Sequence, residues 1–598
     1  MTAINHSPGS LGRATRQAAV GRWLGAALLL ALTIGMSVRA RYGFDGSDES
    51  FYLATANRLL LGQRLGIDEW HPAQFYTPLL VPFLAVYKAA VPSGAGVLLA
   101  FRWLHVCFSG ATALALYGCC RRRGAALPGL LAGALMLFYC CAPMRAAQYK
   151  QLSGAFCVWA FTLAEAAGPA PTGRRRWAAL LSGVALACAV LCCPAFAIPA
   201  AAGVVLLLAR RADRRRGAWI AAGVCACAAL YVALALPWGD LGAFFRNLPY
   251  VLSDPEHTET LAEKLADWLA YHRIRLSLWQ GISIFLASAF ALWDGRTGRA
   301  ASAWRQAVWG VYGALSLLFA GLSLRRLARG DEAFLLAFAA AGIPVALAAL
   351  LRRRCRWETA LYLCGLALSL CWTVCSNTSA RPLYGYILCC CALLPLSGRL
   401  VTELYAGIGR RAAAAGTLAA GLALAGSMGW VAVAGVYRDA PLEQLTTPLT
   451  AGPAKGLYTT KAHAKEYREL LALVKEVRET YPESTAFFTK ILPWGYLCGD
   501  WACAAPTVWR TEVSSPRLEA YDALHPGSLP DLVFLCADGV GDYEASPPAG
   551  IRKAVRGFNK NDLSGWFYDQ ALASAEIIRQ NSYLTVYRVT TSDAIEVK

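Results

Sequence analysis

The sequence lacks most of the short patterns that identify a soluble enzyme or a metal protein. It contains no Gly-rich phosphate-binding loop and no internal repeat, and no spacing of its Cys and His residues matches a zinc site. No small-residue cleavage site follows the first apolar run, so this run is not a removable signal peptide. The Lys and Arg residues occur as short clusters between apolar runs, a distribution that argues against nucleic-acid binding.

Acidic residues are scarce in the first 436 positions, which hold 18 of the 38 Asp and Glu residues but 40 of the 57 Lys and Arg residues. This part therefore carries a net charge of +22, whereas residues 437–598, with 17 basic and 20 acidic residues, carry −3. The chain is 57% hydrophobic and has a mean hydropathy of +0.41, above the usual soluble range. A basic apolar part followed by a balanced tail is what positive-inside sorting of a membrane protein produces.

Repeated apolar runs of about 17–25 residues predict membrane-spanning helices. Three arginines precede the first run, so we expect a cytoplasmic N-terminus, and most later basic clusters then fall on the cytoplasmic side. A cluster at 325–329 would face outward, so either the span near 303–323 is not a simple crossing or this loop breaks the charge rule. Most of the 21 cysteines lie inside the runs, where they act as small hydrophobic residues. The thirteen predicted spans lie near residues 21–38, 97–119, 125–142, 151–168, 177–193, 194–209, 217–236, 276–293, 303–323, 332–351, 358–376, 383–398 and 412–436.

Two acidic segments fall outside the membrane under this threading. They are the first outer loop, residues 39–95, and a second loop at 237–275, which together hold eleven of the eighteen acids. The first loop ends in a Pro-bearing apolar stretch that is short for a straight crossing, so we interpret it as interfacial or partly re-entrant. The second loop is too polar to span and too long for a turn, and it predicts a surface helix over the mouth of a site.

The last part of the chain changes character. Residues 437–598 alternate a helical pattern with short β-rich runs between Gly and Pro clusters, which predicts a soluble α/β domain. Cys498 and Cys503 either pair in an oxidising space or remain free thiols. The predicted fold is thus an all-α polytopic membrane protein over residues 1–436, in the plasma membrane, with an extracytoplasmic α/β domain over 437–598.

One outer segment, GSDESFYLATANRLLLG, has the features of a short helix carrying a reactive carboxylate. Ser47 is a good N-cap residue, Asp48 and Glu49 occupy the first turn, and Gly62 is a natural stop. The helix dipole helps to keep a first-turn carboxylate ionised, and an ionised carboxylate can accept a proton from a hydroxyl. First-turn acids are also common in helices without any catalytic role, so this pattern alone leaves both interpretations open.

The order of motifs around this helix resembles that of the integral-membrane GT-C glycosyltransferases. The resemblance rests on Asp48-Glu49-Ser50-Phe51-Tyr52, Leu60-Leu61-Gly62, Thr77-Pro78-Leu79 and Ala100-Phe101-Arg102, all within the first 120 residues. The sequence is most similar in appearance to the protein O-mannosyltransferase-like group, which includes the lipid A aminoarabinose transferase and the Rhizobium lipopolysaccharide sugar transferases. The resemblance implies a hexosyl- or pentosyltransferase that uses a polyprenyl-phosphate monosaccharide, a hydroxyl acceptor and the lipid bilayer, with no nucleic-acid partner.

The resemblance also implies roles for individual residues. Asp48 is expected to be the base that activates the acceptor hydroxyl in an inverting transfer, and Glu49 is expected to orient the site or help hold a metal. Arg102 and Arg381 are expected to bind the donor phosphate, with Tyr384 as a weaker companion of Arg381. Other residues expected at the site are Tyr52, His71, Tyr76 and Lys150.

The sequence departs from the family pattern at two places. Tyr76 precedes Thr77-Pro78-Leu79 where the family often has a lysine that meets phosphate, and Lys150 or His71 is the expected substitute. An aspartate that some members carry in a later outer segment is absent near Gln148, which leaves dependence on a divalent metal ion and the donor sugar open. The alternative function is a transporter or flippase. The absence of a repeat and the placement of the acids at one membrane face favour the enzyme.

Overall fold

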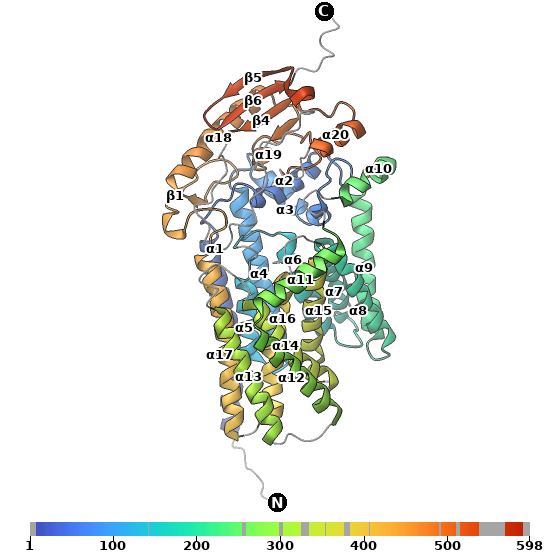
Figure 1. The fold of residues 1–598 in the computed structure, drawn as a ribbon, viewed down its shortest axis with the longest axis vertical. Helices are drawn as coiled ribbons and strands as arrows, with labels where there is room; N and C mark the ends of the chain where they lie inside the picture. Colours follow the sequence, from blue (N-terminus) through green and yellow to red (C-terminus); the bar gives the residue numbers. More distant parts are fainter. Residues whose placement is uncertain are drawn as a thin grey trace, which may run out of the picture.

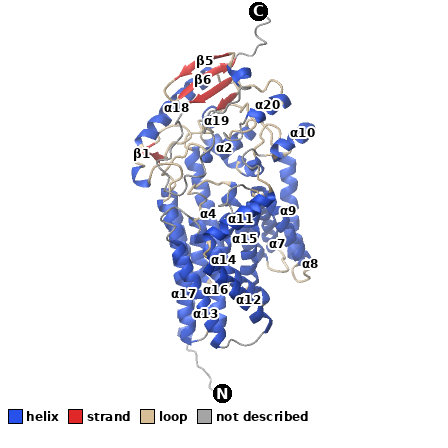
Figure 2. Ribbon diagram, viewed as in Figure 1, coloured by secondary structure: helices blue, strands red, loops and turns tan. Residues whose placement is uncertain are grey.

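The computed structural model describes residues 8–140, 143–253, 259–297, 303–324, 334–352, 354–375, 383–405, 407–488, 492–509, 515–537 and 568–589. Within these residues a long helical bundle carries a smaller α/β layer at one end (Figures 1 and 2). The predicted fold class, a polytopic helical membrane protein with a C-terminal α/β domain, is confirmed.

Every one of the thirteen predicted spans contains a helix. The helices that correspond to them are α1 (Pro8–Arg39), α4 (Val97–Arg122), α5 (Ala126–Phe138), α6 (Tyr149–Ala167), α7 (Arg175–Cys192), α8 (Ala197–Ala209), α9 (Arg214–Ala235), α12 (Leu278–Thr297), α13 (Ala303–Leu324), α14 (Phe334–Leu351), α15 (Arg356–Val374), α16 (Leu383–Leu404) and α17 (Gly407–Ala434).

Fewer than thirteen of these helices meet the length and composition of a full membrane span. Eight helices in the described part of the chain do so, or nine if α11 (Leu261–Arg275) and α12, bent by 103°, count as one broken span. The apolar part of α1 and the helices α5 and α8 are shorter than 18 residues, and 18 residues rise only about 27 Å. Length and composition of the described helices thus give eight or nine full-length spans, and the other predicted spans correspond to shorter or less apolar helices of the same bundle.

The end of the bundle away from the α/β layer is basic, and two of its buried acids, Glu358 and Asp294, are each paired with two arginines. Gly96 and Leu98, at the start of α4, hydrogen bond to the backbone of the tail, so Arg121–Arg123 at the other end of α4 lie far from it. Here Glu358 accepts from Arg123 (3.1 Å) and pairs with Arg399 (3.3 Å). Asp294, Arg305 and Arg352 form a second group at the ends of α12, α13 and α14. The predicted outward arginines at 325–329 lie outside the described residues.

The first outer loop folds into short helices beneath the α/β layer. These are α2 (Asp48–Leu60), the 3₁₀ helix η1 (Pro72–Leu79) and α3 (Val81–Ala90). As expected, the Pro-bearing stretch forms short helices and no straight crossing. The second loop forms η3 (Trp238–Asp240), α10 (Leu241–Leu252) and α11, and α10 lies beside α20 (Ser515–Leu524) at the level of the α/β layer (Figure 1).

The tail contains the predicted helix and strands. Its elements are η5 (Leu442–Gln444), β1 (Thr447–Pro448), β2 (Tyr458–Thr459), α18 (Lys461–Thr480), β3 (Ala486–Phe488), α19 (Gly495–Gly499), α20, β4 (Leu532–Cys536), η7 (Tyr568–Leu572), β5 (Ala575–Gln580) and β6 (Leu584–Val589). The larger sheet has the order β3-β4-β6-β5, with β3 and β4 parallel and the other pairs antiparallel. Thr460 caps α18, whose apolar face is buried against the sheet and the first outer loop.

One hydrophobic core joins the first outer loop to the tail. Phe44, Phe51 and Leu53 belong to the same buried cluster as Tyr467 and Trp494 of the tail. Arg58 of α2 is fully buried and reinforces this junction, because it pairs with Glu69 (3.0 Å) and donates to the carbonyl of Ala505 (2.9 Å). The α2 helix is thus held from both sides, by the bundle and by the tail.

Candidate active site

Asp48 and Glu49 begin α2, as the sequence predicts, and Gly62 follows its end with φ +86°. Ser47 occupies the N-cap position but its side chain does not cap the helix; its hydroxyl instead accepts a hydrogen bond from Nη1 of Arg438 (3.0 Å). The backbone N–H groups of the first turn and the helix dipole favour negative charge at this point. The fold therefore places two carboxylates at a helix terminus that stabilises them.

Asp48 is held by two residues that lie far from it in the sequence. Its Oδ1 accepts from Nη1 of Arg438 (3.0 Å), and its Oδ2 accepts from the hydroxyl of Tyr437. Burial raises the pKa of Tyr437 well above its ordinary value, and the charge of Asp48 raises it further, so the phenol stays neutral and donates. The Asp48 side chain keeps 14% of its surface exposed, so a small group can reach it.

Glu49 forms a buried ion pair with Arg102. Nε and Nη2 of Arg102 donate to the two oxygens of Glu49 at 2.5 and 2.6 Å, and Nη1 donates to the carbonyl of Ala40 (2.8 Å). Both side chains are almost fully buried. All three guanidinium nitrogens of Arg102 are therefore engaged, and the pair joins α2 to α4.

Asp45 lies beside these carboxylates. One of its oxygens accepts from the backbone N–H of Ser47 (2.8 Å), and the other has no hydrogen-bond partner among the described residues. Burial raises the pKa of Asp45 to about 8, and the nearby charges of Glu49 and Asp48 act in the same direction. Asp45 is therefore mostly protonated at neutral pH.

A third arginine lies near this pair without a full set of acceptors. Arg145, in the connection between α5 and α6, is 5% exposed, and its Nε and Nη2 have no hydrogen-bond partner within the described ranges. Burial lowers its pKa, and the charge of Arg102 contributes to this lowering. The side-chain nitrogen of Gln148 also lacks an acceptor in the described part of the chain. Buried donors without acceptors are rare in native structures, so this group suggests a missing anionic partner.

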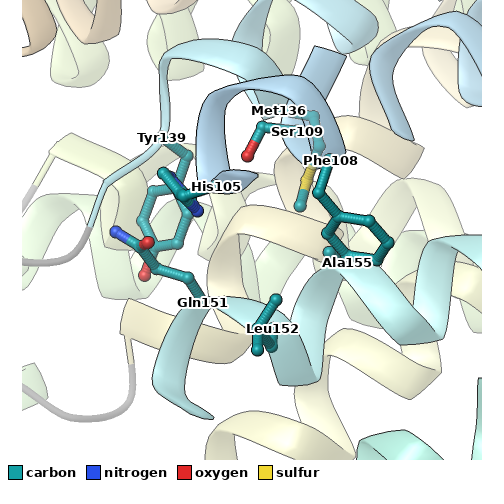
Figure 3. A pocket seen from close by; sticks show the side chains of 8 residues that line it. All are labelled: His105, Phe108, Ser109, Met136, Tyr139, Gln151, Leu152 and Ala155. Atoms are coloured by element: carbon teal, nitrogen blue, oxygen red, sulfur yellow. The ribbon is translucent and has the colours of Figure 1, made fainter. Parts of the chain in front are cut away.

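A narrow crevice is lined in part by His105, whose electrostatics Arg145 influences. It is lined by residues of α4, α5 and α6 and of the connection after α5, and it is too tight to hold a water molecule (Figure 3). His105, Tyr139 and Gln151 approach one another there (Figure 3). The residues lining it are His105, Phe108, Ser109, Met136, Tyr139, Gln151, Leu152 and Ala155.

Several arginines lie around Asp48. Electrostatic interactions link Arg39, Arg102 and Arg145, and Arg438 joins them through Asp48. Arg102 is paired with Glu49 and Arg438 with Asp48, and the guanidinium nitrogens of Arg39 donate to backbone carbonyls. Arg145 is therefore the arginine of this group whose Nε and Nη2 have no acceptor among the described residues.

Other predicted site residues form an aromatic cluster. Tyr52 donates to the side-chain oxygen of Gln148 (3.2 Å), and its ring lies 6.0 Å from Tyr76 and 5.9 Å from Tyr149. The ammonium group of Lys150 lies 5.5 Å from the ring of Tyr149. The structure thus brings Tyr52, Tyr76 and Lys150 close together.

Two further predicted residues lie at the edges of this cluster. The Tyr384 ring is 5.5 Å from Trp372, whose own ring is 5.7 Å from Tyr149. His71 begins η1, where its Nδ1 accepts from the backbone N–H of Ala73 (2.9 Å) and its ring packs at 4.7 Å from Phe51. Arg381 lies outside the described residues.

Sequence reasoning missed Tyr437, Arg438 and Arg145. Tyr437 and Arg438 directly follow the last span, and nothing in their local pattern distinguishes them from an ordinary interfacial pair. Arg145 lies five residues before Lys150, and its local sequence pattern gave no signal for a role at the site.

The donor set does not fit a metal ion. Within the described ranges, no group of three or more His, Cys, Asp or Glu side chains is arranged to hold one. The carboxylates of Asp48 and Glu49 are each bound to an arginine. We therefore derive no catalytic step through a metal.

The chain was compared with known families and structures. No family model matches it, and no curated protein sequence matches it. Among solved structures, it is similar to the crystal structure of the oligosaccharyltransferase of Archaeoglobus fulgidus tethered to an acceptor peptide. That match has a TM-score of 0.41 and 13% sequence identity, and it covers 86% of this chain and 69% of the other.

Proposed function

We propose that this protein is a membrane glycosyltransferase of the GT-C type, which moves a monosaccharide from a polyprenyl phosphate to a hydroxyl acceptor on the extracytoplasmic face. The observation that carries the proposal is a partly exposed helix-terminal carboxylate, Asp48, near a buried arginine, Arg145, whose Nε and Nη2 have no hydrogen-bond partner among the described residues. The donor, a sugar phosphodiester, is a singly charged anion. Transfer of its sugar to an alcohol requires one base and one group that stabilises the leaving phosphate.

In this mechanism Asp48 is the general base. The Tyr437 hydroxyl already donates to Oδ2 of Asp48, and it marks the position from which an acceptor hydroxyl would donate. The acceptor proton moves to the carboxylate while the acceptor oxygen attacks the anomeric carbon. The bond from that carbon to the phosphate oxygen breaks with its electron pair, so polyprenyl phosphate leaves and the configuration inverts.

Arg145 is the group we assign to the leaving phosphate, together with Lys150, Tyr384 and Arg381. Its free Nε and Nη2 offer two parallel donors, the geometry that suits phosphate oxygens. Arg102, in contrast, has no nitrogen to spare, so we assign it and Glu49 a positioning role. Their ion pair fixes the first turn of α2 and thereby the direction of Asp48. Tyr52, Tyr76 and His71 line the same region.

The test is a transfer assay in proteoliposomes with a panel of polyprenyl-phosphate sugars and the full-length protein. Asp48→Asn should lower kcat by about 10²–10⁴-fold, the usual contribution of a general base. Arg145→Gln should lower kcat by about 10²–10³-fold, as expected for loss of one charge-stabilising donor.

The control is Asp240→Asn, which removes a half-exposed acid before α10, remote from Asp48 in sequence, and should leave kcat within about twofold. Full transfer by Asp48→Asn would reject the assignment of the base. Movement of a lipid-linked sugar or solute across the bilayer without glycosyl transfer would instead favour the transporter.

A further inference from the structure

Two cysteines from different helices meet at the end of the bundle nearest Asp48. Cys193 directly follows α7 and precedes η2 (Pro194–Phe196), and Cys375 directly follows α15. The η2 turn packs against α15, and the thiols of Cys193 and Cys375 hydrogen bond to each other. The α7 end also packs against η1, which carries Tyr76, so the cysteine pair lies on the same side of the bundle as α2.

The two thiols differ in accessibility. Cys375 is exposed, whereas Cys193 is completely buried. An oxidant in the surrounding water therefore reaches Cys375 first, and Cys193 can react only with Cys375 or another buried neighbour. From the positive-inside distribution we expect this end of the bundle in the extracytoplasmic space, where disulfides form and persist.

We infer that Cys193 and Cys375 form a disulfide in the mature protein. The oxidant is a disulfide of an extracytoplasmic thiol–disulfide exchange partner. The Cys375 thiolate attacks one sulfur of that disulfide, which forms a mixed disulfide and releases the first thiolate. The Cys193 thiolate then attacks Sγ of Cys375, the protein disulfide forms, and the second thiolate leaves. The two protons lost by the cysteines end on the two released thiols, and the partner accepts two electrons.

Two other thiol pairs in the bundle test how selective this oxidation is. Cys188 of α7 hydrogen bonds to Cys227 of α9, and Cys157 of α6 hydrogen bonds to Cys364 of α15. These four residues lie inside helices, and no aqueous oxidant meets them while they are surrounded by lipid and protein. We expect them to remain thiols although their contact resembles that of Cys193 and Cys375.

The disulfide would have a structural effect on the candidate active site. It fixes the end of α7 to the end of α15, one turn after Trp372, whose ring lies 5.7 Å from that of Tyr149 in the aromatic cluster. The inference does not depend on the proposed transferase function, because it concerns the covalent state of the chain and is measured without any substrate.

The experiment alkylates free thiols with N-ethylmaleimide in intact cells and again after denaturation, followed by digestion and mass spectrometry of the full-length protein without reduction. We expect a cross-linked peptide that joins Cys193 to Cys375 and disappears on reduction. Cys193 and Cys375 should both escape alkylation before reduction and become alkylated after it, whichever state Cys498 and Cys503 adopt in the tail.

Control variants separate this pair from its neighbours. Cys371→Ser removes a cysteine one turn before Cys375, and the double variant Cys188→Ser with Cys227→Ser removes another contact pair. Both should keep the cross-link, whereas Cys375→Ser should abolish it. Alkylation of all 21 cysteines without reduction would overturn the inference, and so would a cross-link through Cys371 or Cys188.

A second measurement uses the unaltered sequence, so it does not depend on whether a cysteine variant folds. The purified, reduced protein should form the same cross-link with oxidised glutathione. If it does so while the cellular protein stays fully reduced, the inferred oxidation in the cell is wrong even though the two thiols are close.

Discussion

The buried pair of Glu49 and Arg102 offers a prediction whose magnitude follows from the structure. Glu49→Gln removes one charge at nearly constant volume and leaves the Arg102 guanidinium buried without a counter-ion. Breaking a buried, hydrogen-bonded ion pair from one side costs about 3–5 kcal/mol. Unfolding entropy of ~2.1 cal/mol/K per residue gives roughly 1.3 kcal/mol/K for this chain, so the thermal midpoint should fall by about 2–4 °C.

The cysteines of the bundle provide the assay. Many of them are completely buried, so a thiol-reactive dye that fluoresces on reaction reports unfolding of the detergent-solubilised protein. Arg102→Met should lower the midpoint by a similar amount, since it leaves Glu49 buried and unpaired. In the double variant the midpoint should fall by clearly less than the sum of the two single falls, because no uncompensated charge remains.

The control removes an exposed pair by Glu469→Gln. Glu469 lies 3.7 Å from Lys465 on the surface of α18, where an ion pair contributes less than about 1 kcal/mol. Its midpoint should change by less than 1 °C. If Glu49→Gln behaves like this control, or if the effects of the two single variants simply add, the buried ion pair is not what holds α2 in place.

Three further predictions concern other parts of the molecule. Because the pKa of Asp45 is raised to about 8, the stability it contributes is complete below pH 4 and is lost as the pH rises through 8. Asp45→Asn should therefore show a smaller fall of the thermal midpoint from pH 5 to 9, and equal slopes would argue against the raised pKa. Gly183→Ala should lower the midpoint because its Cβ would lie 2.0 Å from a carbonyl oxygen of α9, whereas Gly203→Ala, with open space around it, should not; the reverse order would contradict this helix contact. Arg58→Gln should speed hydrogen exchange in the tail and cost about 3–5 kcal/mol, since Glu69 is left buried without its partner, and unchanged exchange in residues 486–536 would refute the junction.

Much of the fold follows from local sequence patterns. Apolar residues at helical spacing over 464–477 predicted α18, and alternating or continuous β-rich runs predicted β3, β4 and β6. The position of Asp48 in a first turn could also be predicted, because N-terminal helix signals are local. Helix length was less predictable, since α5 ends at Phe138 after thirteen residues although the next residues, Tyr139 and Cys140, are also apolar.

The partners of the candidate site could not be predicted in this way. Tyr437 and Arg438 contact Asp48 across about 390 positions, and only the packing of the tail on α2 brings them there. Arg102 was expected to bind the donor phosphate, but in the fold its guanidinium group is paired with Glu49. A sequence shows which side chains are charged; the fold decides which charges neutralise each other.

The common core of the first outer loop and the tail has a consequence for biosynthesis. Asp48 is made near the beginning of translation, but its partners Tyr437 and Arg438 follow α17, and the aromatic residues that cover α2 come later still. The ribosome therefore finishes nearly three quarters of the polypeptide before the site can close. A nascent chain stopped at any earlier point would carry Asp48 without the two residues that hold it.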